Sequence, residues 1–149
     1  MPVWPEIVVT KPDSPEVLFA VEVKAGSGDL AVAETQLKDY MVRQSCPVGM
    51  LVTPEDTLFF RNLYTGYEAD TVRKVAACRT DELLGDMGQA VNVESYLVLR
   101  VEQWLEKLPD GGRRSWPPSA QEVIESLVLP AVAGGTIRAT GPRWRRTGS

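Results

Sequence analysis

The sequence predicts an α/β protein built on a mixed β-sheet with helices on its faces. Three observations lead to this prediction. Short β-branched and apolar runs alternate with turn residues, a helical stripe of apolar residues stands between the second and third of these runs, and amphipathic stretches follow nearer the C-terminal end. The sequence contains no internal repeat. We therefore expect a single domain over residues 1–140, followed by a basic tail over residues 141–149.

Composition narrows the class of protein. The 149 residues are 44% hydrophobic and 24% charged, as in ordinary globular domains. The apolar runs are too short to span a bilayer, and the N-terminal residues lack the pattern of a secretory signal, so we expect a cytoplasmic protein without membrane contact. Cys46 and Cys78 stand alone in the sequence, which predicts two reduced thiols.

The chain has no histidine, and this excludes several catalytic systems. Ser-His-Asp and Cys-His nucleophile systems need an imidazole, and so do Cys/His zinc sites. A catalytic reaction would therefore depend on carboxylates, on lysine or on a metal ion held by oxygen ligands.

The first expected elements are a hairpin and a helix. Residues 6–10 and 17–24 are rich in β-branched and apolar side chains, and the turn-forming residues between them predict an antiparallel hairpin. Residues 30–41 follow with apolar side chains at helical spacing, behind Asp29 as the expected N-cap. Pro47 is expected to end this helix.

The rest of the chain continues the α/β pattern, with a weaker signal beyond residue 62. Ser119 is expected to cap the last helix. The expected elements are strands at 48–53 and 57–61, a weaker strand within 67–78, a helix beginning at Thr80, helices at 93–108 and 119–129, and a short closing strand at 136–140.

Two charged residues interrupt the second strand, which reads FAVEVKAG over residues 19–26. Strand side chains alternate between faces, so Glu22 and Lys24 share one face at the C-terminal end of the strand. Burying an isolated charge is costly, which leaves two explanations open: a structural Glu22–Lys24 pair at the rim of the sheet, or a site into which both side chains point. The hairpin places Glu6 near the same level, and two carboxylates with water suit Mg²⁺.

This arrangement resembles the PD-(D/E)XK nuclease superfamily, which has the restriction endonuclease-like fold. The similarity covers roughly residues 4–61 and is greatest to the N-terminal nuclease domains of type I restriction subunits. The matching residues are Pro5-Glu6, the E-x-K element Glu22-Val23-Lys24, the Q-x-x-x-Y element of Gln36 and Tyr40, and the paired strands in CPVGMLVTPEDTLFF over residues 46–60.

The resemblance implies a fold, an activity and a set of site residues. The fold is a restriction endonuclease-like mixed sheet of four to five strands flanked by helices. The activity is Mg²⁺- or Mn²⁺-dependent cleavage of DNA, with Glu6 and Glu22 binding the metal and Lys24 assisting the attacking water. Gln36 and Tyr40 would support these residues, although Gln36 could equally hydrogen-bond a sheet edge or Tyr40 itself.

The sequence departs from the family pattern in two places. The family usually has Asp where this chain has Glu6; the Asp13 alternative lies in the expected turn, so we prefer Glu6. The family core also begins with a helix before the first strand, often with another acid. That helix is missing, the start is truncated, or a C-terminal helix takes its place. These departures keep a second function open: a catalytically inactive nuclease-like fold that serves as a nucleic-acid-binding, protein-binding or assembly module.

Charge is unevenly distributed along the chain. Residues 1–112 hold 10 Lys and Arg against 18 Asp and Glu, whereas residues 113–149 hold 6 Arg against 2 Glu. Arginine beside tryptophan can bind phosphate and stack on bases, but a solvated tail without a partner is the alternative. Trp104 and Trp116 read as core or rim aromatics, and an exposed sheet edge would also allow a homodimer. The basic residues weighed for nucleic-acid binding are Arg113, Arg114, Arg143, Arg145 and Arg146.

Overall fold

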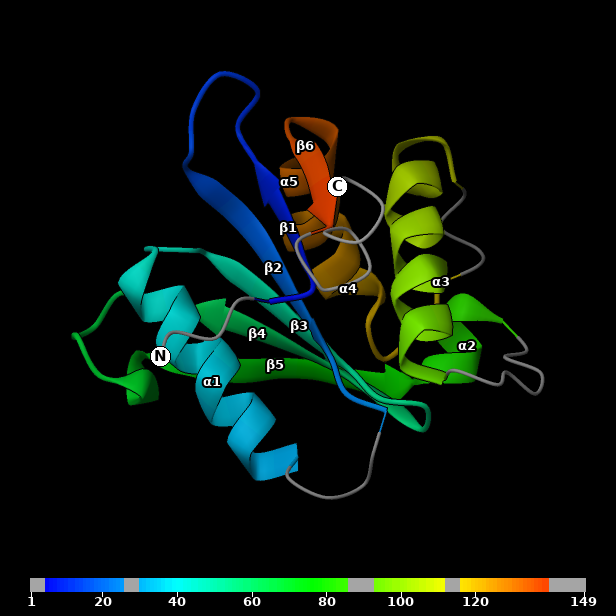
Figure 1. Ribbon diagram of the computed structural model, residues 1–149, viewed down its shortest axis with the longest axis horizontal. Coiled ribbons are helices and arrows are strands. Elements are labelled where there is room, and N and C mark those ends of the chain that lie inside the picture. The colour runs from blue at the N-terminus through cyan, green and yellow to red at the C-terminus, as the bar shows by residue number, and fades with distance from the viewer. Residues whose placement is uncertain (1–4, 26–29, 86–92, 112–115, 140–149) are drawn as a thin grey trace.

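The computed structural model describes residues 5–25, 30–85, 93–111 and 116–139, which form a six-stranded mixed sheet with open edges and helices on both faces (Figure 1). The predicted mixed α/β architecture is confirmed, with six strands where four to five were expected. The strands lie in the order β5-β4-β3-β2-β1-β6. They are β1 (Ile7–Thr10), β2 (Val17–Val23), β3 (Val48–Val52), β4 (Asp56–Asn62), β5 (Val72–Arg79) and β6 (Thr136–Ala139).

The centre of the sheet is built from the predicted hairpin and one parallel crossover. β1 and β2 pair antiparallel, and Ile7 lies opposite Val21. β2 then pairs parallel with β3 through the helix between them, while β3–β4, β4–β5 and β1–β6 are antiparallel. β2 therefore lies inside the sheet with a neighbour on each side, as its apolar sequence predicts.

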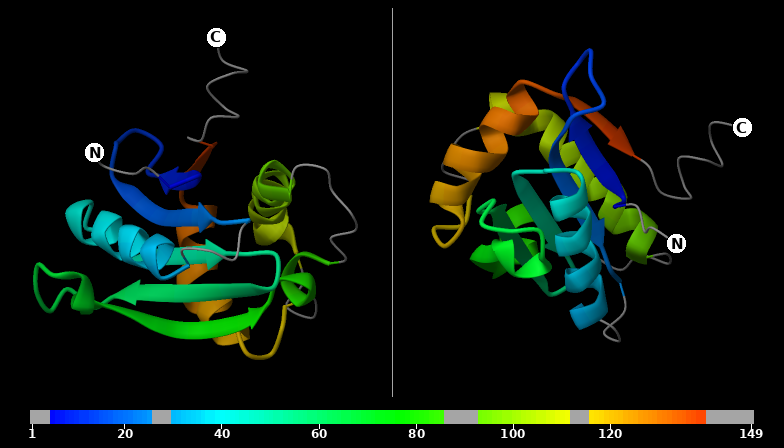
Figure 2. Two further views of the ribbon diagram at one scale, coloured as in Figure 1. Left: turned by 60° about the horizontal axis from the view of Figure 1, so that its bottom comes forward. Right: turned by 90° about the vertical axis from the view of Figure 1, so that its left-hand side faces the viewer.

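One long helix covers one face of the sheet, and several helices cover the other. α1 (Leu30–Arg43) packs on one face, and α3 (Val93–Lys107) packs on the other together with a last helical segment (Figure 2). That segment runs through α4 (Gln121–Val123), the π-turn η4 (Ile124–Val128) and α5 (Leu129–Ala133). The short elements are α2 (Thr80–Leu84) and the 3₁₀ turns η1 (Ala69–Thr71) and η2 (Leu108–Asp110).

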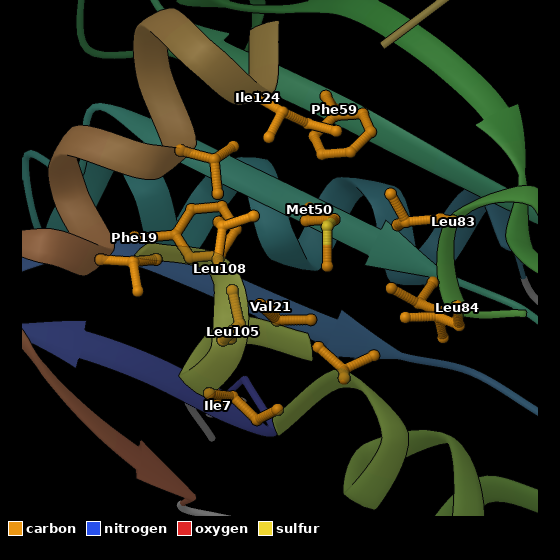
Figure 3. Close-up of a cluster of buried hydrophobic side chains, with 14 of the residues drawn as sticks. Ile7, Phe19, Val21, Met50, Phe59, Leu83, Leu84, Leu105, Leu108 and Ile124 are labelled. Atoms are coloured by element: carbon orange, nitrogen blue, oxygen red, sulfur yellow. The ribbon is translucent and has the colours of Figure 1, made fainter. Parts of the chain in front are cut away.

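The larger hydrophobic core lies between the sheet and the helices that follow β5. Alternate residues of the central strands point into it, and α2, α3 and the last helical segment close it (Figure 3). A smaller core lies between the sheet and α1. Labelled members of the larger core are Ile7, Phe19, Val21, Met50, Phe59, Leu83, Leu84, Leu105, Leu108 and Ile124.

Helix ends differ from the sequence prediction in two places. α1 ends at Arg43, before Pro47, because Ser45 takes a left-handed backbone conformation with φ of 51°. The Cys46 N–H then donates to the Met41 carbonyl at 2.8 Å, which closes the helix in the manner of a Schellman motif. The N-cap predicted at Asp29 lies outside the described residues.

The last helical segment also begins and ends differently from the prediction. Ala120, not Ser119, is the N-cap of α4, and it makes no side-chain capping hydrogen bond. The helix continues past Leu129 to Ala133, with Pro130 directly after the π-helical turn Ile124–Val128. The closing strand predicted near residue 136 is confirmed as β6.

The sequence predicted no membrane-spanning segment and two reduced cysteines. Within the described residues, no helix is long and apolar enough to cross a membrane. Cys46 and Cys78 are both buried free thiols, as predicted. Burial raises the pKa of Cys46 to about 12 and that of Cys78 to about 11.

Replacing Gly135 with alanine should destabilise the fold, because the chain turns there against β1. An added Cβ would lie 2.9 Å from each of two backbone carbonyl oxygens, those of Thr10 and Ala131, and would also meet Val9. We expect Gly135→Ala to lower the free energy of unfolding by about 1–3 kcal/mol in urea denaturation. The matched control Gly66→Ala, where a Cβ meets nothing within 4 Å, should stay within about 0.5 kcal/mol of wild type. Equal effects of the two substitutions would contradict this packing.

Candidate functional site

The hairpin register brings Glu6 beside Glu22. Ile7 pairs with Val21, and Glu6 and Glu22 are the next residues of the two strands toward the open end of the hairpin, away from its turn. Both carboxylates alternate with residues of the larger core, so both belong to the sheet face that α1 covers. Lys24 follows on the same face, and its backbone N–H donates to the Val52 carbonyl at 2.9 Å. The structure therefore places Glu6, Glu22 and Lys24 at one end of one face, as the sequence predicts.

Glu22 is the most buried of the three side chains, with only 6% of its surface exposed. Burial raises the pKa of this carboxyl, and the nearby Glu6 and Glu94 raise it further. Lys24 and a hydrogen bond from the Val23 backbone N–H act in the opposite direction, but the pKa still reaches about 7. The Glu6 pKa is also raised, first by burial and then by Glu94, against the lowering effect of Lys24.

These electrostatics disfavour a simple structural ion pair. Lys24 does lower the pKa of Glu22, but burial and the two neighbouring carboxylates outweigh that effect. Glu22 and Lys24 are also not among the ion pairs recorded for the described residues. Those ion pairs are Lys11–Glu16, Lys38–Glu34, Arg43–Asp39 and Arg79–Asp81. The group thus carries more negative charge than its one lysine neutralises.

Glu94 is the site residue that the sequence analysis missed. It lies in the first turn of α3, and one of its carboxylate oxygens accepts a hydrogen bond from the Ala25 backbone N–H at 3.4 Å. Its charge acts on both Glu6 and Glu22. No local pattern could have revealed this, because only the packing of α3 across the sheet brings Glu94 to the end of β2.

Gln36 and Tyr40 lie on α1, over the same face of the sheet. Gln36 is half-buried, one turn before the buried Tyr40. Burial and, to a smaller extent, Cys46 raise the pKa of Tyr40 to about 12, against the lowering effect of Arg43. Tyr40 lines a cavity of about 610 Å³ together with Thr10, Val17, Arg138 and the hairpin turn, beside the start of β2 rather than its end. Support of Glu22 by Gln36 and Tyr40 stays a prediction.

Other predicted residues lie away from this site. Asp13, the alternative metal ligand, is exposed in the hairpin turn at the opposite end of β2 from Glu22. This placement favours Glu6, as the sequence analysis did. The five basic residues weighed for nucleic-acid binding lie outside the described residues: Arg113, Arg114, Arg143, Arg145 and Arg146.

The donor atoms near Glu22 decide which metal ion the site could hold. Among the described residues, no group of three or more His, Cys, Asp or Glu side chains is arranged to hold a metal ion. Glu6 and Glu22 nevertheless provide carboxylate oxygens, which are the ligands of a hard ion such as Mg²⁺ that keeps several waters. A divalent cation would also neutralise the excess negative charge around Glu22. This donor set therefore fits Mg²⁺ or Mn²⁺ with protein ligands supplied by two carboxylates.

The raised pKa of Glu22 predicts that stability falls as pH rises. Between its ordinary value of 4.5 and about 7, the folded chain holds a proton that the unfolded chain has released. The free energy of unfolding should therefore decrease across this window, by on the order of 3 kcal/mol from this group. Glu22→Gln should remove most of that slope and be more stable than wild type at about pH 8. Urea denaturation from about pH 5 to pH 8 measures both effects.

Glu55→Gln is the matched control for that experiment, because Glu55 is an exposed turn acid. This variant should keep the wild-type dependence of stability on pH. If Glu22→Gln also keeps it, the Glu22 carboxyl does not titrate as described.

Comparison with known proteins adds no assignment. No protein-family model, no curated protein and no solved structure matches this chain. Any function must therefore be argued from the side chains that the fold brings together, and the charged group at the end of β2 is the strongest basis for that argument.

Proposed function

We propose that this chain is a Mg²⁺-dependent nuclease of the PD-(D/E)XK type that hydrolyses phosphodiester bonds in DNA. The observation that carries the proposal is the placement of Glu6, Glu22 and Lys24 on one face at one end of the hairpin, with too little positive charge for the carboxylates. Mn²⁺ would serve as well as Mg²⁺, because both are bound by carboxylate oxygens.

In this proposal Glu6 and Glu22 hold the metal ion. When bound, the ion supplies Lewis-acid chemistry to a phosphate and a water molecule. Low exposure of Glu22 strengthens its electrostatic interactions, because less water screens them. Glu94 adds negative charge to the same group, which raises the pKa of both Glu6 and Glu22 and would strengthen the attraction of the group for a cation.

Lys24 is the cationic member of the site. It is half-buried, and its charge lowers the pKa of both Glu6 and Glu22, so its ammonium group lies near both carboxylates. An ammonium group in this position can hold a water molecule by hydrogen bonding and can offset negative charge that develops on a phosphate. These are the two roles that the resemblance implies for it.

A second candidate function is a nuclease-like fold without catalysis that binds or assembles with another macromolecule. The two carboxylates proposed as ligands fall short of a three-membered ligand group within the described residues, which favours this candidate. The acidic balance of residues 1–112 points the same way, because it repels DNA at long range. Metal binding and DNA cleavage separate the two functions.

Metal binding should stabilise the protein at about pH 8, where Glu22 is ionised. Mg²⁺ at 10 to 100 times its dissociation constant should raise the free energy of unfolding by about 1.4–2.7 kcal/mol, measured by thermal shift and calorimetric titration. Glu22→Gln should abolish the shift, and Glu55→Gln should keep it. An unchanged melting temperature in the wild type at millimolar Mg²⁺ and Mn²⁺ would support the non-catalytic candidate.

Cleavage of DNA should require the same residues. Glu22→Gln and Lys24→Ala should each reduce metal-dependent nicking of supercoiled plasmid by at least about a hundredfold, because each removes a group that acts on the reacting phosphate or water. Circular dichroism should show both variants folded, and Glu55→Gln should cleave like wild type. Wild-type rates in both site variants would remove the nuclease proposal.

A further inference from the structure

β5 is an outer strand of the sheet and presents an unpaired edge. It pairs antiparallel with β4 on one side, and no strand within the described part of the chain pairs with its other side (Figure 2). Alternate residues of such a strand turn their N–H and C=O groups outward, where another extended chain can pair with them. Val75 is a bulged residue without a partner in β4. The edge therefore offers its backbone in two runs, at residues 72–74 and 76–79.

The hairpin formed by β4 and β5 also exposes apolar side chains. Tyr67, in the loop between the two strands, is 96% exposed, and Val75 on β5 itself is 40% exposed. Half of the exposed large hydrophobic side chains in the described chain belong to this hairpin, namely Leu63, Tyr64, Tyr67 and Val75. Exposed apolar residues are usually scattered singly over a protein surface, so their gathering on one hairpin indicates a surface for contact.

Positive charge accompanies these apolar side chains. Arg61 of β4 lies directly opposite Arg73 of β5, and Lys74 is the next residue of the edge strand. All three are exposed, and the ion pairs recorded for the described residues include none of them. Like charges directly opposite each other on neighbouring strands are destabilising, and β5 carries no acidic residue. Carboxylates from a partner would relieve this repulsion.

The acids at the two ends of β5 form no ion pair with these cations. Asp70 precedes the strand, and its backbone carbonyl, rather than its carboxylate, accepts a hydrogen bond from the Arg73 guanidinium at 3.1 Å. Asp81 follows the strand and pairs with Arg79 at 3.1 Å. The unpaired positive charge is therefore concentrated in the first half of β5, at Arg73 and Lys74.

We propose that β5 binds an extended acidic peptide, which adds to the sheet along the unpaired edge. Backbone hydrogen bonds would hold the peptide, and its carboxylates would meet Arg73 on one face of the sheet and Lys74 on the other. A second copy of the chain is a poorer occupant, because β5 beside β5 would bring the same cations together. The inference does not depend on the nuclease proposal, because β3 and β4 lie between β5 and the strand that carries Glu22.

Fluorescence anisotropy of a labelled peptide, titrated with the full chain, tests this site. The probe is a seven-residue peptide in which pairs of glutamates are separated by valines. It should bind with a dissociation constant on the order of 0.1 mM or lower, and a version with lysine in place of glutamate should not bind. A version methylated at alternate backbone nitrogens should bind at least about tenfold more weakly, because it keeps its charge but loses backbone donors.

Two charge reversals locate the peptide on β5. Lys74→Glu and Arg73→Glu should each weaken binding of the acidic peptide by about fivefold, because repulsion replaces attraction. Lys107→Glu is the matched control, since Lys107 is an exposed lysine on α3, and this variant should bind like wild type. Circular dichroism checks the fold, and Lys74→Glu tests the proposal even if Arg73→Glu fails to fold.

Several outcomes would overturn the proposal. They are no binding of the acidic peptide at about 1 mM, equal binding of the methylated peptide, and equal losses in Lys74→Glu and Lys107→Glu. A single-stranded oligonucleotide that displaces the peptide and binds more tightly would assign the edge to a nucleic acid instead. Light scattering should give wild type and Lys74→Glu the same mass, and a different mass would identify a second copy as the occupant.

Discussion

The pairing of β1 with β2 is the constraint on which the candidate site depends. Ile7, Val9, Phe19 and Val21 are fully buried and point from this hairpin into the larger core. A slip of one residue would turn these side chains to the other face, so core packing fixes the register. The same register sets Glu6 beside Glu22. The hydrophobic core and the charged group are therefore two consequences of one strand pairing.

Burial gives the charged group its chemical character. Glu22 sits where apolar side chains surround the strand, so its ionised form is costly, and two further carboxylates increase the cost. A single lysine reduces that cost without removing it. Lys24 lowers the pKa of Glu22, but burial and the neighbouring carboxylates outweigh it, so the group holds either a proton or an excess of negative charge.

The sequence predicted the features that depend on neighbouring residues, such as strands and turns. It did not predict the features that depend on how distant elements pack together. The β-branched and apolar runs of β1 and β2, with turn residues between them, predicted the hairpin, and the alternation of strand side chains predicted the shared face of Glu22 and Lys24. The end of α1 was misplaced, because a left-handed Ser45 closes the helix before Pro47 acts, and serine gives no strong signal for that conformation. Glu94 was missed because its place depends on how α3 docks, some 70 residues after β2 in sequence.

The position of Glu94 bears on the helix that the resemblance leads one to expect before β1. Three alternatives were open for it, and one was that a C-terminal helix takes its place. α3 lies across the end of β2 and brings an acid to the same charged group, hydrogen-bonded to Ala25 at the point where the chain leaves the strand. Electrostatic interaction depends on distance and burial and not on order along the chain. A helix late in the sequence can thus supply charge to a group built on two early strands, which is what the third alternative requires of α3.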